Sequence, residues 1–193
     1  FTVKLLEMLR TGEIDCAILA EPFPDTGLAI APLYDEPFLA AVPSTHPLAQ
    51  QESISTQQLK NETMLLLGAG HCFRDHVLEV CPEFARYASN AEGIRRSFEG
   101  SSLETIKHMV AAGMGVTLVP RLSVANDALQ SPRRRRSDEP YIRYLPIVEP
   151  DGSAPPKRRV SLVWRRSFTR YEAIAALRNA IHACKLLGVE RLN

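Results

Sequence analysis

The sequence is poor in cysteine, has no long apolar run and carries almost no excess charge. Its 193 residues include four cysteines, and 23 basic against 22 acidic residues leave a formal net charge of +1. Four cysteines at this length exclude a small fold held by disulfides, and 45% apolar residues exclude a disordered or collagen-like chain. No stretch approaches the roughly 18 apolar residues that span a bilayer, and Phe1 to Arg10 lacks the pattern of a signal peptide. We therefore expect a globular cytoplasmic protein with no membrane partner.

The balance of charge argues against a nucleic-acid-binding surface, because phosphate contacts need clustered Lys and Arg in excess. One exception is the run Arg133 to Arg136, inside a predicted loop from 130 to 140. Asp138 and Glu139 follow closely, so the run is typical of a short solvated loop. If the protein acts on DNA, we expect another segment to bind it.

Apolar patterning predicts helices that alternate with short strands, which is the α/β class. We expect strands at 14–20, 28–33, 37–42, 64–67, 116–119, 141–147 and 159–165. The best-marked helix starts at Ser101, where Ser101 to Glu104 forms a capping box, and an opening helix ends at Gly12. The last helix, at about 169–187, should pack on the sheet with Cys184 on its apolar face.

One segment, residues 68 to 82, concentrates the side chains that could carry chemistry, with two of the four cysteines and two of the five histidines. It is not a dinucleotide-binding fingerprint, because Phe73 stands where the third glycine belongs, and it has no C-x-x-C motif. A zinc site is one alternative. Its candidate ligands are Cys72, His76, His71 and Cys81. Structural zinc sites usually have tighter paired spacings, so the sequence favours another role.

A reactive thiol is the better-supported alternative. A short buried strand and a glycine turn place Cys72 at the start of a helix, where free N–H groups and the helix dipole favour an anion. His71 and Arg74 add nearby hydrogen-bond donors or positive charge, which also favour the thiolate. Cys72 is therefore a candidate thiolate, whereas Cys16 and Cys184 lie in apolar patterns typical of core residues. We expect no cofactor and no metal.

The spacing of Cys72 and Cys81 limits how they could react with each other. On an unbroken helix, nine residues separate the two by about 13.5 Å along the axis. A disulfide needs Cα atoms within about 7 Å. If these two cysteines pair, the helix must unwind, and oxidation becomes a large local rearrangement.

Several segments match the pattern of one family. The most specific is His71-Cys72-Phe73-Arg74-Asp75, with a second cysteine nine residues after the first. The other matching segments are 12–19, 35–37, 102–105 and 109–120. The part of the last segment that reads Gly-Val-Thr-Leu-Val-Pro indicates only the wide family of LysR-type transcriptional regulators. Together the segments resemble the regulatory domain of the peroxide-sensing members of that family, along the whole chain.

The resemblance implies two Rossmann-like α/β lobes, as in type 2 periplasmic binding proteins, with the chain crossing between them twice. Lobe I would comprise 1–34 and 160–193, and lobe II would comprise 35–159 with the redox cysteines. The family's winged helix-turn-helix and the first strand of lobe I lie outside this sequence. We therefore expect that these 193 residues do not bind DNA on their own.

The resemblance also implies roles for single residues around the motif. Cys72 would be the peroxidatic cysteine, which hydrogen peroxide oxidises to sulfenic acid. Cys81 would be the resolving cysteine, which then forms the disulfide. His71, Arg74 and Asp75 match the motif positions beside Cys72.

Two further positions of the peroxide site follow from the resemblance alone. Thr2 falls where the family has a peroxide-contacting threonine. Arg159 falls where the family has an active-site arginine, and Arg158 could fill the same role. These residues would contact the peroxide rather than react with it.

The implied protein is a sensor and not an enzyme, because each oxidation is stoichiometric and a thiol reductant must reset it. Its output would be a changed arrangement of a homodimer or homotetramer that activates antioxidant genes, with DNA and RNA polymerase bound only by the full-length protein. The competing function is a LysR-type domain that binds a small organic anion between its lobes, at Ser101, Ser102 and the helix they cap. That function would leave the cysteines without a role, and a peroxidase is weaker still.

Overall fold

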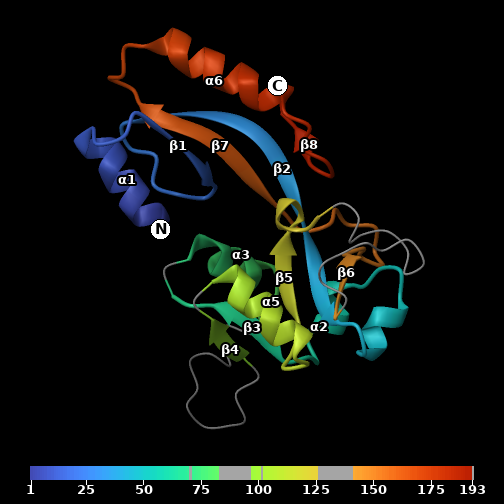
Figure 1. The fold of residues 1–193 in the computed structure, drawn as a ribbon. Coiled ribbons are helices and arrows are strands. Elements are labelled where there is room, and N and C mark those ends of the chain that lie inside the picture. The colour runs from blue at the N-terminus through green and yellow to red at the C-terminus, as the bar shows by residue number, and fades with distance from the viewer. Residues whose placement is uncertain (70, 83–96, 101, 126–140, 193) are drawn as a thin grey trace. The chain divides into compact units, whose positions relative to one another are not determined.

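The computed structural model describes residues 1–69, 71–82, 97–100, 102–125 and 141–192 (Figure 1). The chain divides into two compact units, Phe1–Glu36 with Lys157–Asn193, and Pro37–Pro156, which we call unit 1 and unit 2. The chain leaves unit 1 after Glu36 and returns to it at Lys157. Within the described ranges, no helix has the length and apolar character needed to cross a membrane.

Unit 1 is a small sheet with a helix on each face. Its elements are α1 (Thr2–Thr11), β1 (Cys16–Ala20), the first part of β2 (Leu28–Pro43), β7 (Lys157–Arg165), α6 (Tyr171–Ala183) and β8 (Glu190–Arg191). β1 runs antiparallel to β7, and β8 runs antiparallel to β2. Successive strand residues point to opposite faces, so Val163 packs with Leu9 of α1, and Leu162 packs with Ile174 of α6. The two helices therefore cover opposite faces of the sheet, as Figure 1 shows.

The turn after α1 is fixed from two directions. Gly12 follows the helix with a φ of 86°, a left-handed conformation that glycine adopts without steric cost. Arg165, at the end of β7, donates hydrogen bonds to the carbonyls of Leu9 (2.6 Å) and Ile14 (2.7 Å). One guanidinium group therefore holds both sides of the turn against β7.

Unit 2 is built around the second part of β2. Its other elements are η1 (Pro47–Gln50), α2 (Thr56–Leu59), β3 (Met64–Leu67), α3 (Cys72–Val80), β4 (Ser97–Gly100), α5 (Leu103–Ala111), β5 (Thr117–Pro120), η2 (Arg121–Ser123) and β6 (Ile142–Pro146). β2 lies between β5 and β6 and is antiparallel to both. β3 pairs with β4 in parallel, and its Leu65 N–H donates to the carbonyl of Val116, just before β5 (2.8 Å).

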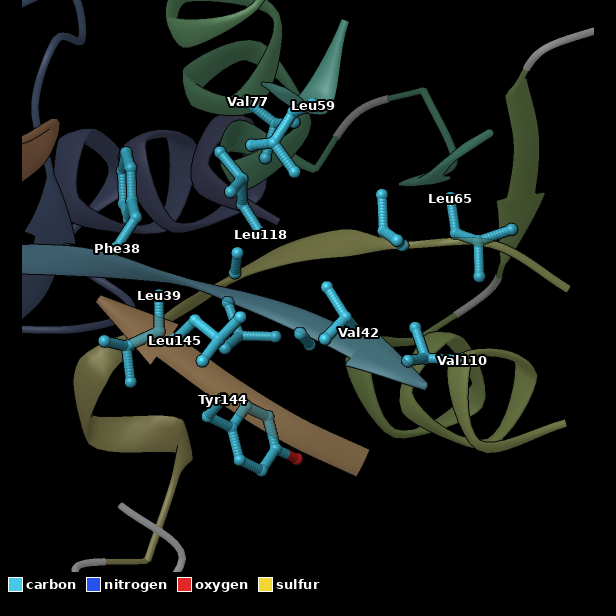
Figure 2. Close-up of a cluster of buried hydrophobic side chains, with 14 of the residues drawn as sticks. Phe38, Leu39, Val42, Leu59, Leu65, Val77, Val110, Leu118, Tyr144 and Leu145 are labelled. Carbon is cyan, nitrogen blue, oxygen red and sulfur yellow. The ribbon is translucent and has the colours of Figure 1, made fainter. Parts of the chain in front are cut away.

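The core of unit 2 covers both faces of β2 (Figure 2). Phe38 and Leu39 extend to opposite sides of the strand, as the alternation of a β-strand requires. Leu118 of β5 and Val77 of α3 lie on the side of Phe38, whereas Tyr144 of β6 lies on the side of Leu39. Each of the five is at most 5% exposed. The helix that carries the cysteine motif is therefore packed on one face of a central strand.

The α/β class is confirmed, but β2 corrects the prediction of two strands at 28–33 and 37–42. It is one strand of 16 residues. The sequence Asp35-Glu36-Pro37 reads as a break, because acids and proline are unfavourable inside a buried strand. Both acids are instead paired with arginines of β7, so the strand continues through them.

Two further predictions need correction. α5 is capped by Ser102 rather than by Ser101, and the Ser102 hydroxyl accepts a hydrogen bond from the N–H of Thr105 (3.1 Å). Ser101 itself lies outside the described residues. The arginine run at 133–136 also lies outside them. α6 ends at Ala183, and Cys184 is exposed rather than part of the core. Ile174 is the one buried residue of α6, so the helix face that was expected to be apolar is buried at that position alone.

Candidate functional site

β3 and α3 place Cys72 at a helix N-terminus, as predicted. All four residues of β3 are buried, and the turn after it starts at Gly68, whose N–H donates to the carbonyl of Gly100 in β4 (3.0 Å). His71 precedes the helix in an extended conformation, with φ −84° and ψ 118°. Cys72 is the first helical residue, in the turn whose backbone N–H groups have no acceptor within the helix. These groups and the helix dipole favour negative charge at this end of α3.

Three predicted site residues lie next to Cys72 along the chain, at the start of α3. The Arg74 guanidinium donates a hydrogen bond of 2.9 Å to the carbonyl of Leu67, the last residue of β3. This bond ties the first turn of α3 to the end of the strand and fixes the direction in which the helix leaves it. Asp75 is exposed in the same turn, where a carboxylate stabilises the positive end of the helix dipole. His71 and Cys72 are both partly buried.

Cys81 lies at the opposite end of α3 and is 0% exposed. Its N–H donates to the carbonyl of Val77 (2.9 Å), and its backbone then leaves the helix with φ −129° and ψ 71°. No disulfide joins any of the four cysteines, all of which the structure describes. Because α3 is intact, Cys72 and Cys81 are separated by about 13.5 Å along its axis. The structure therefore holds the dithiol form.

Thr2 and Arg159 belong to unit 1, whereas the other predicted site residues belong to unit 2. Thr2 is the first residue of α1 and is partly buried. Arg159, in β7, makes a two-pronged ion pair with Asp35, with Nε 2.8 Å from Oδ1 and Nη2 3.1 Å from Oδ2. Arg158 pairs with Glu36, Nε to Oε2, at 2.9 Å. Both candidate arginines therefore have a carboxylate partner.

The carboxylates of Asp35 and Glu36 were not anticipated as part of this arrangement. Asp35 is 3% exposed and Glu36 is 1% exposed, and the Lys157 ammonium lies 2.8 Å from Oδ2 of Asp35. A buried carboxylate needs a charged or hydrogen-bonding partner. The signal that could have located the pairing is two acids inside an apolar strand together with three successive cations at 157–159.

Replacing Asp35 by asparagine is expected to lower the free energy of unfolding near neutral pH by about 2 kcal/mol, the scale of a hydrogen bond to a charged group. Hydrogen bonds from Arg159, and then from Lys157, hold the pKa of Asp35 below its ordinary value of 3.8. A lowered folded-state pKa gives stabilisation that is complete above the unfolded-state value and is lost as the pH falls through the folded-state value.

Urea denaturation over a series of pH values, from about 7 down to about 3, tests this expectation. The difference in unfolding free energy between the wild type and Asp35→Asn should be constant near neutrality and should shrink at the acid end. Asp25→Asn is the matched control, because that side chain is exposed in unit 1. A difference that grew with falling pH, or equal effects of the two substitutions, would contradict the pairing.

The geometry disfavours the zinc site. Cys72 and Cys81 lie at opposite ends of α3, too far apart to bind one zinc ion through Zn–S bonds of about 2.3 Å. In the part of the chain that the structure describes, no group of three or more His, Cys, Asp or Glu side chains could hold a metal ion. Of the predicted anion site, Ser102 caps α5 with its hydroxyl, and Ser101 lies outside the described residues.

Comparison with known proteins identifies a family for this chain. The LysR substrate binding domain family matches residues 2–184. A hydrogen peroxide-inducible genes activator of Pectobacterium carotovorum subsp. carotovorum is 38% identical over 177 residues, which cover 90% of this chain and 52% of the relative. The DNA-binding transcriptional dual regulator OxyR of Escherichia coli K12 is 37% identical over 177 residues, with the same two shares covered. The chain spans about half the length of the curated relatives it matches.

Solved structures of similar proteins include both redox forms. A reduced form of OxyR from N. meningitidis is 35% identical with a TM-score of 0.85, and the match covers 100% of this chain and 82% of that one. A structure of oxidized OxyR is 33% identical with a TM-score of 0.67, and the match covers 94% of this chain and 77% of that one. The similarity therefore extends along the chain in sequence and in fold.

Proposed function

Because this chain belongs to the LysR substrate binding domain family, in the group of the OxyR regulators, we propose that it is the peroxide-sensing domain of a transcription regulator. The curated relatives carry the name hydrogen peroxide-inducible genes activator. The observation that carries the proposal is the placement of Cys72 at the N-terminus of α3, with the reduced thiol of Cys81 buried at its other end. Together they supply a pair of thiols and a structural element that a bond between them would change.

The first chemical step takes place at Cys72. Its thiolate attacks one oxygen of hydrogen peroxide, the S–O bond forms as the O–O bond breaks, and the leaving oxygen takes up a proton and departs as water. The product is a sulfenic acid at Cys72. His71 is the proposed donor to the leaving oxygen, because donors aimed at developing negative charge stabilise the transition state. Thr2 and Arg159 remain donors that only the family resemblance implies.

The second step joins the two cysteines. The Cys81 sulfur attacks the sulfur of the sulfenic acid, the S–S bond forms, and the hydroxyl group leaves as water with the proton of the Cys81 thiol. Two thiols and one peroxide thus give one disulfide and two waters. A thiol reductant returns the disulfide to two thiols, so each copy reacts once per cycle and acts as a sensor rather than as an enzyme.

The output of the reaction is a change in α3. Its unwinding alters the surface of unit 2, and we infer that this change passes to the rest of a cytoplasmic homodimer or homotetramer. The full-length protein, rather than these 193 residues, would bind DNA and RNA polymerase and activate antioxidant genes.

One equivalent of peroxide added to the reduced chain tests the proposal. Mass spectrometry of unreduced peptides should find a Cys72–Cys81 linkage. Amide hydrogen exchange of residues 72–80 should rise at least about tenfold, because the backbone hydrogen bonds of α3 are lost, and a thiol reductant should reverse both changes. Linkages through other cysteines, or unchanged exchange once the linkage is confirmed, would contradict it.

A further inference from the structure

Three aromatic rings of unit 2 contact one another beside the redox helix. Phe38 of β2 meets Phe73 of α3 edge to face, with ring centroids 5.3 Å apart and planes at 80°. The His76 ring lies 6.3 Å from the Phe38 ring and 6.5 Å from the Phe73 ring. All three side chains are at most 7% exposed. We call Phe38, Phe73 and His76 the ring cluster.

The ring cluster connects α3, the helix that would unwind in the proposed switch, to the central strand β2. Phe73 and His76 are three residues apart on α3, so they share one face of the helix. Phe38 lies on the central strand of a sheet, opposite Pro120 of β5, and extends from β2 on the side where Val77 lies (Figure 2). The first half of α3 is therefore anchored to a strand that pairs with neighbours on both edges.

The ring cluster and a Cys72–Cys81 disulfide exclude each other. The intact helix holds the two cysteines about 13.5 Å apart along its axis, whereas the bond requires Cα atoms within about 7 Å. Closing that distance unwinds the segment that contains Phe73 and His76 and removes their rings from Phe38. Breaking the ring contacts is therefore part of the cost of forming the disulfide.

We propose that Phe38, Phe73 and His76 are positioning residues that set the thiol–disulfide equilibrium of Cys72 and Cys81. The inference rests on the proposed function and adds to it the residues that determine how readily the sensor switches. The ring contacts exist only while α3 is helical, so they stabilise the dithiol form and not the disulfide. Weakening them shifts the equilibrium toward the disulfide and lowers the reduction potential of the pair.

The substitution Phe38→Leu tests this, because it keeps an apolar side chain on β2 and removes the ring at the centre of the cluster. In glutathione redox buffers, the equilibrium constant should shift about tenfold toward the disulfide, which lowers the reduction potential by about 30 mV. The rate at which peroxide oxidises Cys72 should stay within about twofold, since the ring contacts affect only the later unwinding of α3. Trapping of the sulfenic acid in a Cys81→Ser background measures that rate.

Matched variants separate the ring contacts from general loss of stability. Leu39→Val also removes buried apolar volume from β2, but on the opposite side of the strand (Figure 2), and should leave the equilibrium within about twofold. His76→Ala should shift it as Phe38→Leu does, and His76→Phe, which restores a ring, should bring it back toward the wild type. Phe73→Leu serves in place of Phe38→Leu if that variant does not fold.

The outcomes separate the inference from the proposed function beneath it. If the wild type forms the Cys72–Cys81 disulfide but Phe38→Leu and His76→Ala leave the equilibrium unchanged, the inference is wrong and the proposed function stands. An equal shift in Leu39→Val also overturns the inference, because the effect would then reflect stability of unit 2 in general. If the wild type forms no such disulfide with peroxide, the proposed function itself fails.

Discussion

Replacing Cys72 by serine is expected to abolish the response to peroxide completely. A serine hydroxyl is not ionised near neutral pH and cannot be oxidised to a sulfenic acid, so the first step cannot begin. After one equivalent of peroxide, no linkage to Cys81 should form, and hydrogen exchange of α3 should remain that of the reduced chain. Peptide mass spectrometry and exchange measured on the same sample provide both readouts.

Cys16→Ser is the matched control for this experiment, because it removes another partly buried cysteine, from unit 1. Burial raises the pKa of the Cys16 thiol, and the nearby Asp15 carboxylate raises it further. Cys16 therefore stays protonated at neutral pH and reacts poorly. The Cys16→Ser variant should keep the full response to peroxide. If this variant loses the response, the assignment of Cys72 as the reacting residue is wrong.

Replacing Gly115 by alanine is expected to lower the free energy of unfolding of unit 2 by about 3 kcal/mol, the upper end of the range for overpacked cores. A Cβ at this position would clash with the carbonyl oxygen of Thr63 and would lie 3.2 Å from Cγ of Leu65. The carbonyl cannot move aside freely, because it accepts the hydrogen bond from the N–H of Val116 (2.9 Å). The close approach of β3 to the start of β5 therefore depends on glycine.

Urea denaturation of Gly115→Ala and Gly68→Ala measures the effect against a control within the same unit. A Cβ at Gly68 would lie 3.8 Å from the carbonyl oxygen of Gly100, which is an ordinary contact. We expect this second change to cost less than about 1 kcal/mol. Equal losses for the two variants would show that crowding at Gly115 is not the cause.

Features determined by a few consecutive residues were predictable from the sequence. β3 has the bounds expected from its four apolar residues, because a strand covered on both faces must be apolar throughout. The start of α3 at Cys72 followed from the glycine turn before it, and the end of α1 followed from Gly12. In each case the signal and the feature are neighbours along the chain.

Features determined by distant residues were not predicted. Asp35 and Glu36 read as a break in a strand, and the arginines that pair with them lie more than 120 residues later. The local pattern around the acids does not identify their partners, and only the three cations at 157–159, taken together with the two acids, could have located the pairing. Periodicity likewise placed Cys184 on an apolar helix face, because it does not indicate where α6 stops or how much of it unit 1 covers.

The candidate site divides in the same way. The motif residues lie on or beside one helix, so their nearness in the sequence grouped His71, Cys72, Arg74 and Cys81, and the resemblance added Asp75. Thr2 and Arg159 come from the resemblance, and their contact with peroxide stays a prediction. Phe38 was not expected near the motif, because its contact with α3 depends on how β2 passes beneath that helix.

The exposed position of Cys184 determines how thiols in this chain can be counted. A thiol reagent added to the folded, reduced protein meets Cys184 at the surface, whereas Cys81 lies in the core. A titration without denaturant therefore under-counts thiols even before any oxidant is added. Oxidised samples can also run as covalent dimers on a non-reducing gel through Cys184, and such a band would carry no information about α3. Oxidation experiments on this chain therefore need a Cys184→Ser background and a thiol count made in denaturant.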